Sequence, residues 1–279
     1  MKRTLITAII IAIAAAIVGY CAYNIIDTLQ ERYISKQEYE NTREEYVSAI
    51  KPRTEVNEEG AQASAEGEEE SVYFPEREID VEGLLQKNED FIAWIYYEDG
   101  KIDYPIVQEK TTSIEKYLDT TFDGNKNPSG CLFISYDGDP TFRFKNSFIY
   151  GHNMKDGTMF GSLKFIYHSP ANMRDPYFYI WTADGKVIKY RVFSAYVVNE
   201  DSKMYSIPFA DGDYDNYIKD ANSLGALTSY IALTKEEKEA FKERNNIVTL
   251  STCYGSAGTT KRLLIQGIEI AKKEIEWDS

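Results

Sequence analysis

The chain has 279 residues, 43% of them apolar, which is enough for one sizeable folded domain with appendages. Its formal net charge of -14 argues against a nucleic-acid-binding protein, because no basic face is evident to neutralise phosphates.

The N-terminus predicts a membrane segment. Lys2 and Arg3 precede an uncharged run, residues 4–24, that is dominated by Ile and Ala. A helix of this length reaches roughly the 30 Å of a bilayer's hydrocarbon core. The two basic residues favour a single pass with the N-terminus inside and the remainder of the chain outside the cell. We therefore expect a transmembrane signal-anchor over residues 1–26.

A cleaved signal peptide is the alternative for this segment. Small residues occur at positions 14–16, but the apolar run exceeds the roughly 7 to 15 residues usual for signal peptides, and no small-x-small site follows it. Tyr20 is too bulky for the residue that precedes a lipoprotein cysteine, so we expect Cys21 to be a plain membrane-embedded thiol.

The next segment, residues 27–71, is expected to connect the membrane to the folded domain. Residues 27–50 are strongly charged and favour a juxtamembrane helix whose charges are mostly solvated. Residues 54–71 are acidic, without an aromatic residue or a Lys, and predict a disordered spacer. The folded domain is expected to cover residues 72–279 and to stand off the membrane.

Helices and strands follow in the folded part. An i, i+3, i+4, i+7 apolar pattern predicts an amphipathic helix over residues 80–95 with Asp80 as N-cap. Cys131 lies in an apolar run and is expected to be a buried structural thiol. Further predicted elements are a hairpin of 93–96 with 101–108, a short helix over 113–118, strands over 131–135 and 142–150, a helix or turn over 159–166, and a hairpin of 177–182 with 186–198.

The last third predicts two helices and two strands. Helices are expected over 213–222 and 234–244, the second opening with a capping-box pattern at Thr234. Strands are expected over 247–252 and 263–270. Pattern alone favours an all-β or α+β domain with a mixed, closed sheet.

Three residues stand where strands meet loops. Cys253 ends one predicted strand and Arg262 opens the next, so that a potential thiolate lies beside a permanent cation. Of the two histidines, His152 lies where a strand gives way to a loop and is the candidate acid/base, whereas His168 has no comparable setting. Taken singly, Cys253 could also be a buried strand thiol, His152 a turn histidine and Arg262 a surface ion-pair partner.

Metal and disulfide chemistry are not expected. Cys21 and Cys131 leave Cys253 without a plausible disulfide partner. Two lone histidines and no Cys pair at ligand spacing argue against zinc, and the carboxylates form no calcium loop. We expect no cofactor.

These residues lie in motifs that resemble those of a known family. Residues 150–160, Tyr-Gly-His-Asn-Met-Lys-Asp-Gly-Thr-Met-Phe, and residues 249–253, Thr-Leu-Ser-Thr-Cys, with Arg262, resemble the signatures of sortases, and the first resembles class B. The resemblance covers roughly residues 81–270. It implies an eight-stranded β-barrel with N-terminal helices. It also implies a helix-bearing insertion between the sixth and seventh strands that forms one wall of a peptide groove.

The resemblance also implies roles for the three residues. Cys253 would attack a peptide carbonyl and form a thioacyl intermediate. His152 would protonate the departing amine and then accept a proton from the incoming one. Arg262 would hold the substrate or stabilise the oxyanion. Ser251 and Thr252 are candidates for substrate contacts, with hydrogen bonding inside the strand as the alternative.

The function implied is a membrane-anchored cysteine transpeptidase. It would cut a Thr-containing, Asn-Pro-x-Thr-like C-terminal sorting motif of a secreted protein and join the new carboxyl to a peptidoglycan-precursor amine. A pilin-joining sortase, a thiol hydrolase of wall peptides and a non-enzymatic wall-binding module are the alternatives. Some class B members carry an acidic residue just after the Cys, whereas Tyr254 follows it here.

Overall fold

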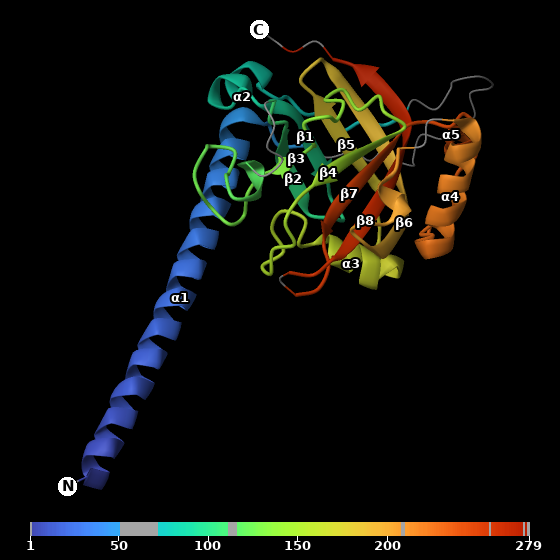
Figure 1. The fold of residues 1–279 in the computed structure, drawn as a ribbon. Helices are drawn as coiled ribbons and strands as arrows, with labels where there is room; N and C mark the ends of the chain where they lie inside the picture. Colours follow the sequence, from blue (N-terminus) through green and yellow to red (C-terminus); the bar gives the residue numbers. More distant parts are fainter. Residues whose placement is uncertain are drawn as a thin grey trace, which may run out of the picture.

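The computed structural model describes residues 2–50, 72–110, 116–207, 210–256, 258–275 and 277. A β-barrel is joined to one long N-terminal helix and flanked by shorter helices (Figure 1). The helices are α1 (Lys2–Tyr46), α2 (Val81–Lys87), α3 (Leu163–His168), α4 (Asp211–Gly225) and α5 (Lys235–Lys242). Single 3-10 turns lie at Lys116–Leu118, Pro170–Asn172 and Lys203–Tyr205.

The strands close into the predicted eight-stranded mixed barrel. They are β1 (Phe91–Tyr97), β2 (Ile102–Val107), β3 (Leu132–Phe133), β4 (Asn146–Tyr150), β5 (Tyr177–Thr182), β6 (Lys186–Asn199), β7 (Ile247–Cys253) and β8 (Lys261–Glu274). Their order around the barrel is β1-β2-β3-β4-β7-β8-β6-β5. The β2–β3 and β4–β7 pairs are parallel and the others antiparallel. The expected fold class is therefore confirmed.

The helix predicted over residues 80–95 is too long, although its N-cap is confirmed. Asp80 Oδ1 accepts a hydrogen bond from the Gly83 backbone N–H at 2.8 Å, and α2 then ends at Lys87. The sequence Phe-Ile-Ala-Trp-Ile-Tyr-Tyr that follows forms β1, which is hydrogen-bonded to β2 on one side and β5 on the other. Its apolar residues fit the 3.6-residue period of a helix as well as a buried strand, and the pairing with β2 and β5 makes the segment a strand.

The β6–β7 connection carries the two predicted helices, α4 and α5. The capping box at Thr234 is confirmed, with Glu237 as its acidic partner. Tyr214 and Tyr217 of α4 pack in a second apolar cluster with Leu264 and other residues of β6 and β8. The connection is thereby held against the outer face of the barrel.

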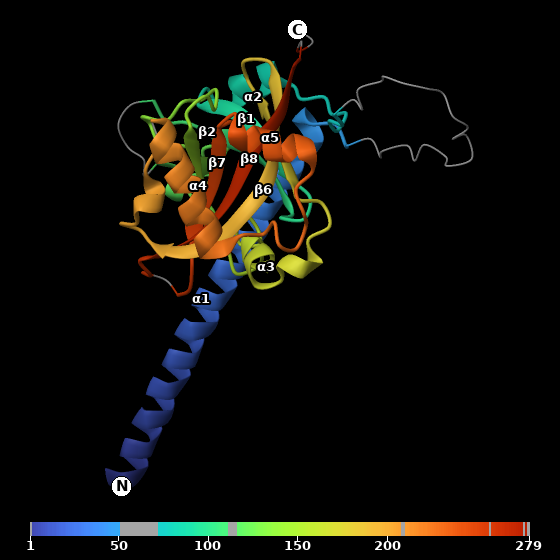
Figure 2. The same cartoon turned by 90° about the vertical axis from the view of Figure 1, so that its right-hand side faces the viewer.

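The first half of α1 is apolar and exposed. Its mean hydropathy of 2.5 makes it the one helix among the described residues that is long and apolar enough to cross a membrane, a property that anchors share with signal sequences. The second half packs against the barrel, as the two perpendicular views show (Figures 1 and 2). The expected juxtamembrane helix is present, and its charged side chains are exposed or half-buried except for Glu38. The sequence did not predict that this half also buries Ser35, Tyr39 and Thr42 against the barrel.

Other predicted elements are present with changed ends. The strand expected over 142–150 begins at Asn146, the one over 131–135 shortens to β3, and the helix expected over 159–166 shifts to α3. The predicted spacer, residues 54–71, lies outside the described residues, as does the first half of the predicted helix over 113–118, whose second half forms the 3-10 turn Lys116–Leu118. The hairpin of β5 and β6 matches its prediction closely.

Candidate active site

Strands β7 and β8 bring the candidate nucleophile next to the candidate cation. In their antiparallel register Cys253 is the direct partner of Arg262, at the end of β7. Ile247 to Leu250 are fully buried, whereas Cys253 is exposed. A strand that is buried along its length and exposed at its last residue presents a thiol at the barrel rim.

The parallel pairing of β4 with β7 brings the candidate histidine to the same rim. Tyr150 pairs with Ser251, and the Gly151 backbone N–H donates to the Ser251 carbonyl at 3.2 Å. A Cβ on Gly151 would lie 2.4 Å from a Leu132 side-chain carbon and 2.8 Å from the Phe160 ring, so a larger residue would require these buried side chains to shift. The chain then turns out of the sheet at His152.

Two hydrogen bonds fix the loop that carries His152. Asn153 Nδ2 donates to the Cys253 carbonyl at 2.8 Å, across one hundred residues of sequence. His152 Nε2 lies 2.6 Å from the Leu118 carbonyl. Because a carbonyl can only accept, this contact requires the proton on Nε2 and leaves Nδ1 of a neutral ring as the acceptor.

All five predicted site residues line one cavity. Its volume is about 330 Å³, and it opens at the barrel rim beside Cys253. The lining residues are Leu118, Phe133, Ser135, Tyr150, Gly151, His152, Ser251, Thr252, Cys253 and Arg262. The sequence motifs, distant along the chain, thus meet around a single concave site.

Ser251 and Thr252 differ in what their side chains can do. Alternation along β7 puts the Ser251 side chain on the same face as Cys253 and that of Thr252 on the opposite face. The Ser251 hydroxyl lies 2.7 Å from the Tyr205 hydroxyl. The Thr252 hydroxyl is buried without a hydrogen-bond partner among the described residues. Ser251 therefore has the side chain better placed for the cavity.

Arg262 is held by a carboxylate that sequence reasoning missed. Its Nη2 donates to Glu200 Oε2 at 2.5 Å, and its Nη1 donates to the Thr259 carbonyl at 2.7 Å. Glu200 directly follows β6, whose last residues pair with the start of β8. No local motif marks Glu200, because it lies 62 residues before Arg262.

Tyr254, at the position where some class B members carry an acid, packs against α3. Its ring lies 5.7 Å from the ring of Tyr167 and 6.0 Å from that of His168. Its hydroxyl is 3.4 Å from His168 Nε2. The second histidine therefore lies next to the loop that follows Cys253, which its sequence setting did not indicate.

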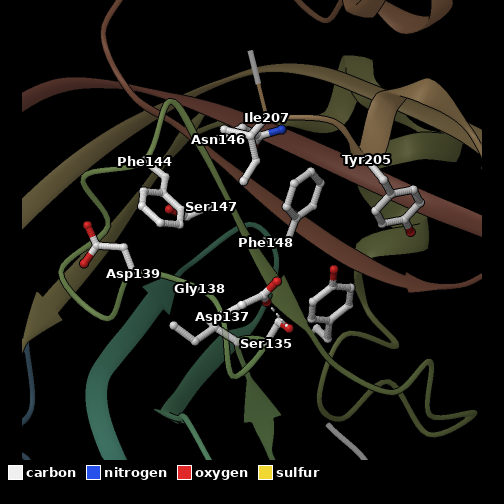
Figure 3. Close-up of a pocket in the computed structure, with 12 residues that line it drawn as sticks. Ser135, Asp137, Gly138, Asp139, Phe144, Asn146, Ser147, Phe148, Tyr205 and Ile207 are labelled. Carbon is white, nitrogen blue, oxygen red and sulfur yellow. Dashed lines mark hydrogen bonds between the residues drawn. The ribbon is translucent and has the colours of Figure 1, made fainter. Parts of the chain in front are cut away.

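A second pocket continues the cavity along the outer face of β4 (Figure 3). Its volume is about 230 Å³, and it shares Ser135 and Tyr150 with the cavity of Cys253. The Phe148 ring lies 5.4 Å from the Tyr205 ring and 6.4 Å from that of Tyr150. This row of aromatic rings, with Tyr205 contributed by the β6–β7 connection, forms a groove leading to Cys253.

Metal coordination has no support among the residues that the structure describes. No group of three or more His, Cys, Asp or Glu side chains lies close enough to hold an ion there. The arrangement of a thiol, an imidazole and a guanidinium fits nucleophilic chemistry on a carbonyl without a metal.

Comparison with known proteins agrees with the motifs. Residues 95–269 match the sortase domain family. Sortase B of Listeria monocytogenes is 31% identical over 193 residues, which are 67% of this chain and 73% of that protein. Solved structures also match, and two of them serve as examples.

The first of these is a Staphylococcus aureus sortase B–substrate complex, with a TM-score of 0.58 and 25% identity over 68% of this chain and 84% of that one. The second is Clostridium perfringens sortase B, with a TM-score of 0.57 and 27% identity over 68% of this chain and 99% of that one. A family match over more than half of the chain, on a barrel of the same type, leaves one assignment: this protein belongs to the sortase family, as a class B cysteine transpeptidase.

Proposed function

We propose that this sortase cleaves a C-terminal sorting motif of the Asn-Pro-x-Thr type and joins the new carboxyl to an amine of a peptidoglycan precursor. The proposal rests above all on the shared cavity of Cys253, His152 and Arg262, which adjoins an aromatic groove. A groove of aromatic side chains suits a short peptide that contains proline, because proline packs on ring faces and its extended conformation is preformed.

The reaction would proceed in two acyl transfers. The Cys253 thiolate attacks the carbonyl carbon of the motif's Thr, and Arg262 stabilises the negative oxygen that results. Collapse of this adduct breaks the peptide bond, and His152 gives a proton to the departing amine. The incoming amine then attacks the thioacyl carbon, gives its proton to His152 and expels the thiolate.

Proton transfer sets a condition on His152. In the resting arrangement Nε2 points at the Leu118 carbonyl. A proton on that nitrogen alone gives a neutral ring, so the ring must also gain a proton on Nδ1, or rotate, before it can donate to the leaving amine. A thiolate–imidazolium pair would meet this condition, because the thiol proton then resides on the histidine.

Ser251 and Thr252 would contribute differently to substrate binding. The Ser251 hydroxyl, on the Cys253 face of β7, would hydrogen-bond the peptide together with Tyr205. Thr252 would contribute through its backbone, since its hydroxyl is on a buried face. The wall made by Tyr205 would fix the peptide's register in the groove.

The apolar part of α1 would anchor the enzyme outside the cell. Lys2 and Arg3 precede an exposed apolar stretch without charges, as expected for a helix that enters from the inside. Membrane fractionation with N-terminal sequencing distinguishes an anchor from a cleaved signal sequence, because only an anchor leaves residues 2–24 on the membrane-bound protein.

Mass spectrometry of the full chain, incubated in detergent with a pool of sorting peptides, tests the proposed reaction. The expected product is a peptide fragment ending in Thr attached to Cys253, which triglycine then converts to an amide-linked product. The Cys253→Ala variant should form neither. A pool in which only other motifs react would refute the Asn-Pro-x-Thr assignment.

The acceptor step is tested separately. Hydrolysis alone at high triglycine would refute transfer to amines and favour a hydrolase of wall peptides. A preference for a Lys side chain over triglycine would favour a pilin-joining enzyme.

A further inference from the structure

The membrane segment and the barrel are connected by one unbroken helix. Backbone helix runs through α1 from Lys2 to Tyr46, so no hinge separates the apolar half from the half that contacts the barrel. The first charged residue after the apolar run is Asp27. Four residues later the Glu31 carbonyl already accepts a hydrogen bond from Asn127 Nδ2 at 2.9 Å.

Further contacts fix the rotation of α1 about its axis. The Tyr39 hydroxyl donates to the Gly130 carbonyl at 2.5 Å, and its ring packs edge-on against Tyr104. Glu38 accepts hydrogen bonds from the Asp123 backbone N–H and from Asn125 Nδ2, both at 3.1 Å. Because these groups are buried or half-buried and lie on one face, α1 is docked in one orientation.

The helix therefore sets the distance between the barrel and the end of the apolar run. With a rise of about 1.5 Å per residue, Glu31 lies roughly 6 Å and Ser35 roughly 12 Å beyond Asp27 along the axis. Ser35 is buried and shares a small cavity with Thr158 and Met159, which belong to the loop that carries His152. The catalytic loop thus lies at headgroup distance from the membrane core.

The barrel end that faces the N-terminal half of α1 is the end that carries the site. In both views α3 and the loop that follows β7 lie at this end, and α2 lies at the opposite end (Figures 1 and 2). We call residues 151–168, which comprise the His152 loop and α3, the lower rim. Cys253 lies beside it, through the hydrogen bond from Asn153.

The lower rim has the composition of a membrane-contacting surface. Phe165 on α3 is 56% exposed, and Lys164 Nζ lies 5.6 Å from the centre of its ring. Lys155 is exposed, and neither lysine has an ion-pair partner among the described residues. An exposed aromatic residue beside an unpaired lysine is typical of the interface between lipid headgroups and water. Residues 151–168 hold two lysines and one carboxylate, Asp156, so the rim carries a small excess of positive charge on a chain whose net charge is -14.

We propose that the lower rim rests on the anionic lipid headgroups of the membrane that α1 spans, with Phe165 among the headgroups. The cavity of Cys253 then opens onto the headgroup layer, and a membrane-bound substrate reaches it by lateral diffusion. This inference depends on the proposed anchoring of α1, but it does not depend on which motif or amine the enzyme uses.

Lipid quenching of a site-specific fluorophore tests the contact. The full chain, with Cys21→Ala and Cys253→Ala, is placed in phosphatidylglycerol-containing nanodiscs that carry a headgroup nitroxide. A bimane label is attached at Phe165→Cys or, as the control, at Leu85→Cys. Leu85 is 39% exposed on α2, at the opposite end. Cys131 is buried and does not compete for the label.

We expect several-fold stronger quenching at position 165 than at position 85. Equal quenching at the two positions, in protein that co-floats with lipid, would overturn the contact while leaving the anchoring intact. Failure to co-float would overturn the anchoring and this inference with it, whereas transpeptidation of soluble peptides is measured independently of both.

A second variant separates docking from anchoring. Six Gly and Ser residues inserted after Thr28 break the helix between the apolar run and the barrel contacts. We expect this insertion to abolish the difference in quenching and, in protein that retains Cys253, to leave turnover of soluble peptides unchanged. Undiminished quenching at position 165 would show that the rigid helix does not hold the rim on the lipid, and would overturn that part of the inference.

Discussion

A buried ion pair fastens the β6–β7 connection to the barrel. Arg191 of β6 is fully buried, and its Nε lies 3.1 Å from Glu237 Oε1 on α5, a close ion pair outside hydrogen-bond geometry. The Tyr177 hydroxyl donates to the same oxygen at 2.7 Å, and Arg191 Nη2 donates to the Ile231 carbonyl at 2.8 Å. The β6–β7 connection, which supplies Tyr205 to the groove, is therefore held to the barrel through α5.

Replacing Glu237 by Gln removes the charge and retains the shape. The amide oxygen can accept from Tyr177 or from the Thr234 backbone N–H but no longer from both, and the guanidinium is left buried without a counter-charge. Breaking a buried pair in this way costs about 3–5 kcal/mol. At roughly 2–4 °C per kcal/mol for a domain of this size, the melting temperature should fall by about 6–20 °C. Thermal unfolding of the full chain in detergent, followed by circular dichroism, measures the shift.

The same helix offers a matched control. Glu239 pairs with Lys242 at 2.6 Å, but both side chains are exposed, and such a pair contributes only about 0–1 kcal/mol. Glu239→Gln should therefore shift the melting temperature by a few degrees at most. Equal shifts for the two variants would refute the reasoning. A double replacement, Arg191→Met with Glu237→Leu, should recover part of the loss because no unpaired charge remains.

Three further predictions concern the thiols and the held arginine. Cys253→Ala should abolish the acyl-enzyme seen by mass spectrometry and leave the melting temperature unchanged, since the residue is exposed. Burial raises the pKa of Cys131 to about 12, so only about one thiol in ten thousand is ionised at pH 8. Iodoacetamide should then modify Cys253 but reach Cys131 only in urea; labelling of both in the native protein would contradict this. Glu200→Gln should raise KM several-fold by loosening Arg262, with little change in stability; unchanged kinetics would show that the pair does not position the guanidinium.

Strands with strong local patterns were predictable from the sequence. The β5–β6 hairpin has alternating residues around a Gly-containing turn, and β7 and β8 are rich in β-branched residues. The site motifs were visible because Cys253 and His152 each stand where such a strand ends. Their meeting depends on the parallel β4–β7 pair, which no local pattern encodes and which was not predicted.

What the sequence did not predict depends on long-range packing. The charged second half of α1 has the composition of a solvated helix, but Glu38 is buried because backbone and amide N–H groups of the 123–125 loop satisfy its carboxylate. Glu200 and Tyr205 reach the site from the segment that follows β6, about fifty to sixty residues before the residues they contact. Such contacts follow from the order of the strands in the barrel, which cannot be predicted from a sequence segment of ten or twenty residues.

The parallel β4–β7 pair also has a consequence for biosynthesis. Its partners, such as Asn146 and Ile247, are roughly a hundred residues apart, so these two strands can pair only after nearly the whole chain has been synthesised. The β1–β2 hairpin needs only local sequence and can form earlier. The reactive sulfur therefore enters its cleft late in folding, which limits premature acylation of an incomplete enzyme.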